Sequence, residues 1–171
     1  LSRKTSMSSA PVRIFTIGVY GSSEDSFFSA LLGVGIDLFL DVRARRGVRG
    51  SQYAYVNAKR LIDRLEHIGI RYTHVKDVAP SQDIRRLQGA ADAAAGVIKR
   101  DRRVLSASFR VAYEQECLSS FDSRAFASAY LAFASKPVLF CVEREPEACH
   151  RSLLAARLSR DLKIPVEDLQ P

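Results

Sequence analysis

The sequence has few cysteines, no long apolar run and no internal repeat, and each absence narrows the class of protein. Its three cysteines, Cys117, Cys141 and Cys149, are an odd number without a signal-peptide pattern, which indicates a reducing cytoplasm and no disulfide framework. No apolar stretch reaches membrane-spanning length, so we expect no membrane association. Without a repeat or a long linker, the chain of 171 residues indicates one globular domain.

The amino terminus lacks any pattern of regular structure. Residues 1–11 are polar and begin without methionine, and the single methionine of the chain is Met7. We expect these residues to be a disordered leader or a remnant of expression, followed by one α/β domain over residues 12–171. With 47% hydrophobic residues, the chain can bury a core of ordinary size.

Basic residues outnumber acidic ones. The chain has 26 Lys and Arg against 19 Asp and Glu, a formal net charge of +7. This excess favours anionic partners, among them phosphates, nucleotides and nucleic acid, and it does not choose between them.

Strands and helices alternate through the first half of the chain. Apolar strand patterns and helical stripes follow each other over residues 12–18, 23–32, 36–42, 58–68 and 70–75. Ser23 and Asn57 stand where the two helices need N-caps. The second strand is apolar almost throughout, as expected for a parallel strand that is covered on both faces.

The second half begins with alanine-rich helical segments between residues 80 and 136. Two or three helices fit, around residues 83–95, 106–118 and 123–134. A buried strand over residues 138–142, a helix from about Glu147 and a short strand over residues 164–169 complete the pattern. The sequence therefore predicts a three-layer α/β fold, with a mostly parallel sheet of about five strands and a helical insert between the third and fourth strands.

Chemically versatile side chains gather in the turn after the strand 138–142. Cys141 and Glu143 end that strand, and Cys149, His150 and Arg151 open the next helix. Unpaired N–H groups at a helix start favour an anion. The spacing of Arg151 from either cysteine does not fit the phosphate loop of a cysteine phosphatase or a sulfur transferase.

Each of these side chains has two interpretations. Cys149 is either an activated thiol or a small buried side chain. His150 is either a general acid or base or a capping residue. Arg151 either grips a phosphate or carboxylate or pairs internally with Asp41 or Glu143.

A metal site made by Cys141, Cys149 and His150 lacks an obvious fourth ligand. His67 or His74 would have to supply it, so the sequence predicts no metal site and leaves any cofactor unknown.

A second group of polar residues follows the second strand. Asp41 and Arg43 end that strand, and Arg45, Arg46 and Arg49 continue into what we call the arginine loop, residues 43–49. With the tyrosines at positions 53 and 55, this loop could hold a phosphate backbone and stack bases. Alternatively, it is a solvated loop whose tyrosines pack on the core.

Three segments, taken in order, resemble the family called domain of unknown function 488. They are TIG at residues 16–18, DVR at residues 41–43 with the arginines after it, and CVEREPEACHRSLL at residues 141–154. Residues 47–57 resemble an arginine-rich branch of that family. The resemblance implies a three-layer α/β fold and brings no settled activity, substrate or cofactor. Many members have His-Ser after Thr-Ile-Gly, whereas this chain has Val19 and Tyr20, so no role of that histidine carries over.

Two functional hypotheses follow. A third alternative is an interaction module whose charges pair internally. In the first, the helix start binds, or binds and acts on, an anionic small molecule or nucleotide. Glu143, Cys149 and His150 would carry any chemistry, and Asp41, Arg43, Arg45, Arg46, Arg49, Cys141, Arg151 and Ser152 would contact the ligand. In the second, the arginine loop makes the chain a nucleic-acid-binding accessory protein.

The first hypothesis makes a geometric prediction. Because parallel strands share one carboxyl edge, Asp41 or Arg43 should lie within a side-chain length of Glu143 or Arg151, in a concave site. The sequence indicates neither the substrate, nor the reaction, nor the oligomeric state.

Overall fold

A computed structural model describes residues 13–171, so the expected leader and Val12 of the expected first strand lie outside the described residues. The five strands among them are β1 (Ile14–Ile17), β2 (Leu38–Asp41), β3 (Arg71–His74), β4 (Pro137–Phe140) and β5 (Val166–Leu169). The six α-helices are α1 (Glu24–Val34), α2 (Ala58–His67), α3 (Gln82–Ala94), α4 (Ala107–Tyr113), α5 (Ser123–Phe126) and α6 (His150–Leu162).

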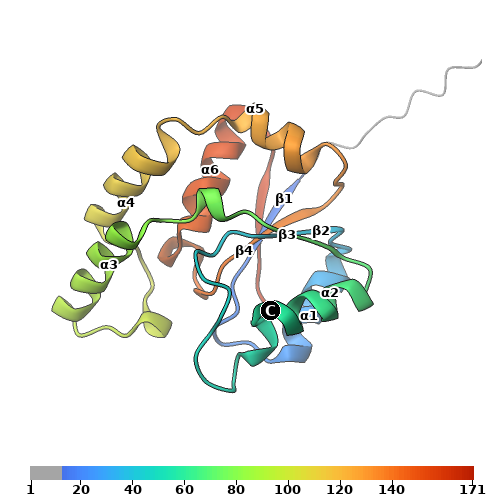
Figure 1. The fold of residues 1–171 in the computed structure, drawn as a ribbon, viewed down its shortest axis with the longest axis horizontal. Coiled ribbons are helices and arrows are strands. Elements are labelled where there is room, and N and C mark those ends of the chain that lie inside the picture. The colour runs from blue at the N-terminus through green and yellow to red at the C-terminus, as the bar shows by residue number, and fades with distance from the viewer. Residues whose placement is uncertain (1–12) are drawn as a thin grey trace, which may run out of the picture.

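All five strands are parallel and lie in the order β3-β2-β4-β1-β5. Figure 1 shows α1 and α2 on one side of this sheet and α3 to α6 on the other. Right-handed crossovers explain this division. The connections from β1 to β2 and from β2 to β3 run toward the β3 edge of the sheet and place their helices on one face. The connections from β3 to β4 and from β4 to β5 run toward the β5 edge and place their helices on the opposite face. The three-layer α/β fold and the insert between the third and fourth strands are confirmed.

The core fills both interfaces between the sheet and the helices. Every residue of β1, β2 and β4 is buried, which explains why these strands are apolar almost throughout. On one face, the Phe27 ring of α1 lies 5.6 Å from the Phe140 ring, in an edge-to-face arrangement. On the other face, Leu154 and Leu158 of α6 are fully buried. No helix among residues 13–171 has both the length and the apolar character that crossing a bilayer requires.

The two expected N-caps behave differently. Ser23 caps α1 as predicted, and it exchanges hydrogen bonds with Ser26 in a capping box. Asn57 stands at the N-cap of α2, but its side chain makes no capping bond. Its Oδ1 instead accepts a hydrogen bond from the backbone N–H of Val48, at 2.6 Å. Asn57 therefore helps to hold the arginine loop.

The helix after β4 begins later than predicted. A 3-10 turn over Pro146–Ala148 comes first, and α6 begins at His150 and not at about Glu147. The reason is Cys149, whose extended backbone (φ −139°, ψ 142°) separates the turn from the helix. Cys149 thus occupies the N-cap, and His150 is the first helical residue.

Gly18 allows the end of β1 to approach the chain after β4. A Cβ atom at this position would lie 2.0 Å from the carbonyl oxygen of Glu143. We predict that Gly18→Ala destabilises the fold by about 3 kcal/mol, the upper end of the usual cost of overpacking. Gly33→Ala is the control, because a Cβ there meets nothing within 4 Å and helix propensity improves. Urea denaturation measures both variants, and equal stabilities would contradict the steric explanation.

Candidate functional site

A cavity of about 500 Å³ opens at the carboxyl ends of β2 and β4. These neighbouring strands continue to helices on opposite faces of the sheet, the arrangement that creates a ligand crevice in open α/β folds. The arginine loop, the strand end 141–143, the helix start 148–150 and parts of the insert between Pro80 and Phe109 line it. Arg43 and Glu143 share this cavity, whereas Asp41 and Arg151 are not among its lining residues.

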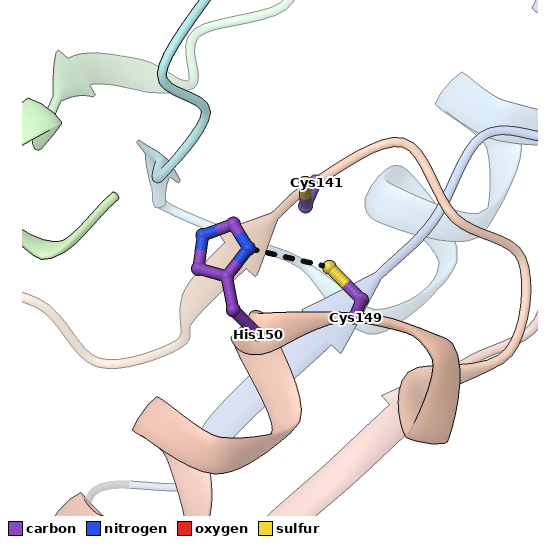
Figure 2. A group of neighbouring side chains, drawn as sticks. All are labelled: Cys141, Cys149 and His150. Carbon is purple, nitrogen blue, oxygen red and sulfur yellow. Dashed lines mark hydrogen bonds between the residues drawn. The ribbon is translucent and has the colours of Figure 1, made fainter. Parts of the chain in front are cut away.

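Cys149 and His150 form a buried thiol–imidazole pair at the start of α6 (Figure 2). The Sγ of Cys149 lies 3.8 Å from Nδ1 of His150, and Nε2 lies 2.9 Å from the carbonyl oxygen of Val42. Because a carbonyl only accepts, Nε2 carries a proton, and in the neutral ring Nδ1 presents its lone pair to the sulfur. Burial lowers the pKa of His150, but neighbouring Cys141 and Glu143 and the bond to Val42 outweigh burial and raise it.

Cys141 completes a cluster of three donor groups. Its Sγ donates a hydrogen bond to Oε2 of Glu143 at 3.2 Å, and the donor atoms of Cys141, Cys149 and His150 lie within 4.8 Å of one another. The adjacent Cys149 thiol, burial and the negative charge of Glu143 raise the pKa of Cys141 well above its usual value. All three cysteines of the chain are free, as predicted. A cluster of this kind can supply a nucleophilic thiol or metal ligands.

Glu143 is a buried and firmly held carboxylate. Its Oε1 accepts a hydrogen bond from Nη2 of Arg102 at 2.7 Å and lies 3.6 Å from Nζ of Lys99. Burial raises the pKa of this carboxyl, but the charges of Lys99 and Arg102 prevail and lower it to about 2. Glu143 therefore carries a fixed negative charge at neutral pH, which makes it a weak general base.

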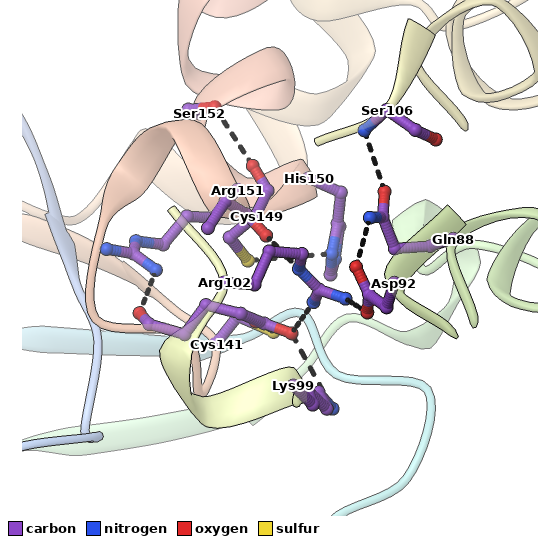
Figure 3. Close-up of polar contacts among 12 residues, drawn as sticks. Gln88, Asp92, Lys99, Arg102, Ser106, Cys141, Cys149, His150, Arg151 and Ser152 are labelled. Atoms are coloured by element: carbon purple, nitrogen blue, oxygen red, sulfur yellow. Dashed lines mark hydrogen bonds and ion pairs between the residues drawn. The ribbon is translucent and has the colours of Figure 1, made fainter. Parts of the chain in front are cut away.

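Arg102 is one of several site residues, with Lys99 and Asp92, that the sequence analysis did not place at the site. Its side chain is 9% exposed, and the guanidinium bridges Glu143 and Asp92, with 2.8 Å between Nη1 and Oδ2 of Asp92. Gln88 donates to the other oxygen of Asp92 and accepts from the backbone N–H of Ser106, which extends the network through the insert (Figure 3). The charged turn over residues 99–103 was visible in the sequence, but no local pattern shows that Arg102 folds back onto β4.

Arg151 is bound internally. Its fully buried guanidinium donates to the carbonyl oxygens of Glu143 at 2.5 Å and Arg144 at 3.0 Å, and lies 3.4 Å from a carboxylate oxygen of Asp168. Of the two interpretations, the structure shows internal pairing, but the carboxylate is that of Asp168 and not, as predicted, that of Asp41 or Glu143. Ser152, also outside the cavity lining, donates to the carbonyl oxygen of Cys149 at 2.9 Å.

Asp41 and Arg43 form a buried bidentate pair. Nε and Nη2 of Arg43 lie 2.8 and 2.7 Å from the two carboxylate oxygens, and the Tyr72 hydroxyl donates to Asp41 at 2.9 Å. The guanidinium carbon also lies 4.7 Å from the centre of the Phe140 ring. Nη1 of Arg43 is buried and has no hydrogen-bond partner among residues 13–171.

The rest of the arginine loop divides between the cavity and the surface beside it. Arg45 and Arg49 are exposed and line the cavity, whereas Arg46 does not line it and approaches Tyr72. Tyr53 and Tyr55 are 3% and 4% exposed and belong to the core. Their rings are therefore covered and do not offer a face to a base.

The depressed pKa of Glu143 predicts how stability depends on pH. A carboxyl group whose pKa falls on folding stabilises the fold at any pH above its pKa in the unfolded chain, here about 4.5. This stabilisation is lost as the pH falls from there toward the folded pKa of about 2. The difference in free energy of unfolding between wild type and Glu143→Gln should therefore narrow by about 3 kcal/mol over this range. Urea denaturation at stepped pH measures it. Exposed Glu147→Gln is the control, and parallel pH profiles for wild type and Glu143→Gln would contradict the assignment.

Comparison with known proteins places the chain in a family. The family model described as "Domain of unknown function DUF488" matches residues 23–158, well over half of the chain and including Cys141, Glu143 and Cys149 to Arg151. No curated protein and no solved structure was found to match. The arginine-rich branch stays a prediction. The matched span covers β2 to β4, the insert and most of α6, so the chain belongs to the DUF488 family.

Proposed function

We propose that the cavity binds a phosphate-bearing small molecule or nucleotide. The observation that carries this proposal is the charge of the lining. Seven basic side chains line the cavity, namely Arg43, Arg45, Arg49, Arg85, Lys99, Arg100 and Arg102, against the two acids Asp92 and Glu143. Arg102 and Lys99 contact these acids, and Arg43 pairs with Asp41 beside the cavity. The four other arginines of the lining have no ion-pair partner among residues 13–171, and their charge favours an anion.

Arg43 strengthens the proposal. Its Nη1 is buried without a partner, and an unsatisfied buried donor costs roughly 1–3 kcal/mol. A phosphate or carboxylate oxygen would satisfy this donor while Asp41 keeps the other two nitrogens in place. The buried Arg43 and the exposed Arg45 and Arg49 would then contact one anion from different depths.

The size of the cavity favours a small molecule over the nucleic-acid alternative. A volume of about 500 Å³ falls within the range typical of small-molecule sites, about 300–1,000 Å³. Base stacking would need exposed aromatic rings, and the tyrosines beside the arginine loop are buried. We further infer a reducing cytoplasm as the compartment, since the three cysteines are free.

A thermal-shift screen tests the proposal. The probes are inorganic phosphate, ATP, GMP, a sugar phosphate and a short single-stranded oligonucleotide. We expect a nucleotide or sugar phosphate to raise the melting temperature, because a ligand at a hundred times its Kd stabilises the fold by about 2.7 kcal/mol. A shift by the oligonucleotide alone, with a steep salt dependence, would support the nucleic-acid alternative instead.

Charge variants locate the binding. Arg45→Ala with Arg49→Ala should weaken binding of the active probe at least about tenfold, because two cationic contacts are lost. The control is Arg103→Ala with Arg124→Ala, which removes the same charge from exposed residues outside the cavity lining. Both double variants should change the free energy of unfolding by no more than about 0.5 kcal/mol per substituted residue. Equal weakening in calorimetric titration would contradict a site in the cavity.

A further inference from the structure

We propose that Cys141, Cys149 and His150 bind a divalent metal ion of the zinc class at the inner end of the cavity. The donor atoms come from two segments, the chain directly after β4 and the start of α6. They lie within 4.8 Å of one another, with 3.8 Å between Cys149 Sγ and His150 Nδ1. In a tetrahedral zinc site, donors about 2.0 to 2.3 Å from the ion lie roughly 3.5 to 3.8 Å apart, so only small side-chain rotations are needed.

His150 is oriented as a metal ligand. Nε2 lies 2.9 Å from the carbonyl oxygen of Val42, which fixes the tautomer and leaves the Nδ1 lone pair beside the sulfur. Metal-binding histidines commonly donate their second N–H to a backbone carbonyl or carboxylate in this way. Figure 2 shows the ring of His150 and the two cysteines converging from α6 and the end of β4.

The backbone around the donors is also held. Arg151 donates to two consecutive carbonyl oxygens, of Glu143 and Arg144, in the connection that joins Cys141 to Cys149. Ser152 donates to the carbonyl oxygen of Cys149. The cysteines are 6% and 1% exposed and His150 is 5% exposed, so the three donors are arranged before any ion binds.

The kind of donor selects the kind of ion. Two thiolates and one imidazole suit zinc and other borderline-soft cations, and do not suit magnesium or calcium, which prefer oxygen. On binding, the thiols release their protons to solvent. His67 and His74, the fourth ligands considered from the sequence, are not part of the cluster. All three donors line the cavity, so the fourth position faces the space where a water or a ligand oxygen would coordinate.

Metal analysis and cobalt substitution test the site in the full chain. Protein purified without a metal-binding tag should contain about one zinc ion, and the chelated protein should take up one Co²⁺ per chain. Bound Co²⁺ should show tetrahedral absorption and a thiolate-to-cobalt charge-transfer band whose intensity corresponds to two thiolates, a readout that needs no variant. Absence of tight Co²⁺ binding, or binding without that band, would overturn the proposal.

Cysteine variants assign the ligands. Cys141→Ser and Cys149→Ser should each lower Co²⁺ affinity by more than the roughly 10- to 100-fold loss that follows removal of a second-sphere partner. Cys117→Ser is the matched control, because Cys117 is half-buried and lies outside the cluster. Unchanged affinity in both cluster variants would refute the assignment.

Thiol labelling of the wild type distinguishes a metal site from an activated thiol. Because it needs no variant, it can be used even where a serine variant does not fold. Zinc should protect Cys141 and Cys149 from a thiol reagent until chelator is added, and should leave the labelling of Cys117 unchanged. Rapid labelling of Cys149 in the presence of zinc would support a thiol–imidazole nucleophile and overturn the metal site. None of these measurements uses an anionic ligand, so their failure leaves the proposed anion binding untouched.

Discussion

The buried guanidinium of Arg151 ties the connection after β4, which carries site residues, to strand β5. It joins the carbonyl oxygens of the connection after β4 to the carboxylate of Asp168 on β5, across the intervening strand β1. Hydrogen bonds to two carbonyls and one carboxylate compensate for the cost of removing this charge from water. The side chain therefore acts through the backbone of Glu143 and Arg144, which it positions, and not through contact with the cavity.

Much of the fold could be predicted because it depends on local patterns. Apolar strands, alternating helices and the Ser23 cap identified a parallel sheet, and parallel strands must bring the ends of β2 and β4 to one edge. The side-chain directions could not be predicted in this way. His150 bonds to a carbonyl 108 residues away, and Arg102 reaches Glu143 from 41 residues away. Such contacts depend on packing between layers, which leaves no periodic pattern in the sequence.

The charges in the cavity are arranged by depth. Its acids, Asp92 and Glu143, are paired with Arg102 inside the protein, so they do not oppose an incoming anion. A zinc ion bound by two thiolates would be neutral as a group and would keep this balance. The proposed metal site and the proposed anion site are therefore compatible, with the metal at the inner end and the free arginines nearer to solvent.

In the proposed anion complex, the different exposure of the cavity arginines would separate the rate of association from the duration of binding. Arg45 and Arg49 face solvent, where their fields attract anions over a distance that salt shortens to about 8–10 Å. Arg43 is 3% exposed and stacked on Phe140, where screening by salt is weak. Rising ionic strength would therefore slow association with an anion far more than it speeds dissociation, so a complex once formed would persist in salt that hinders its formation.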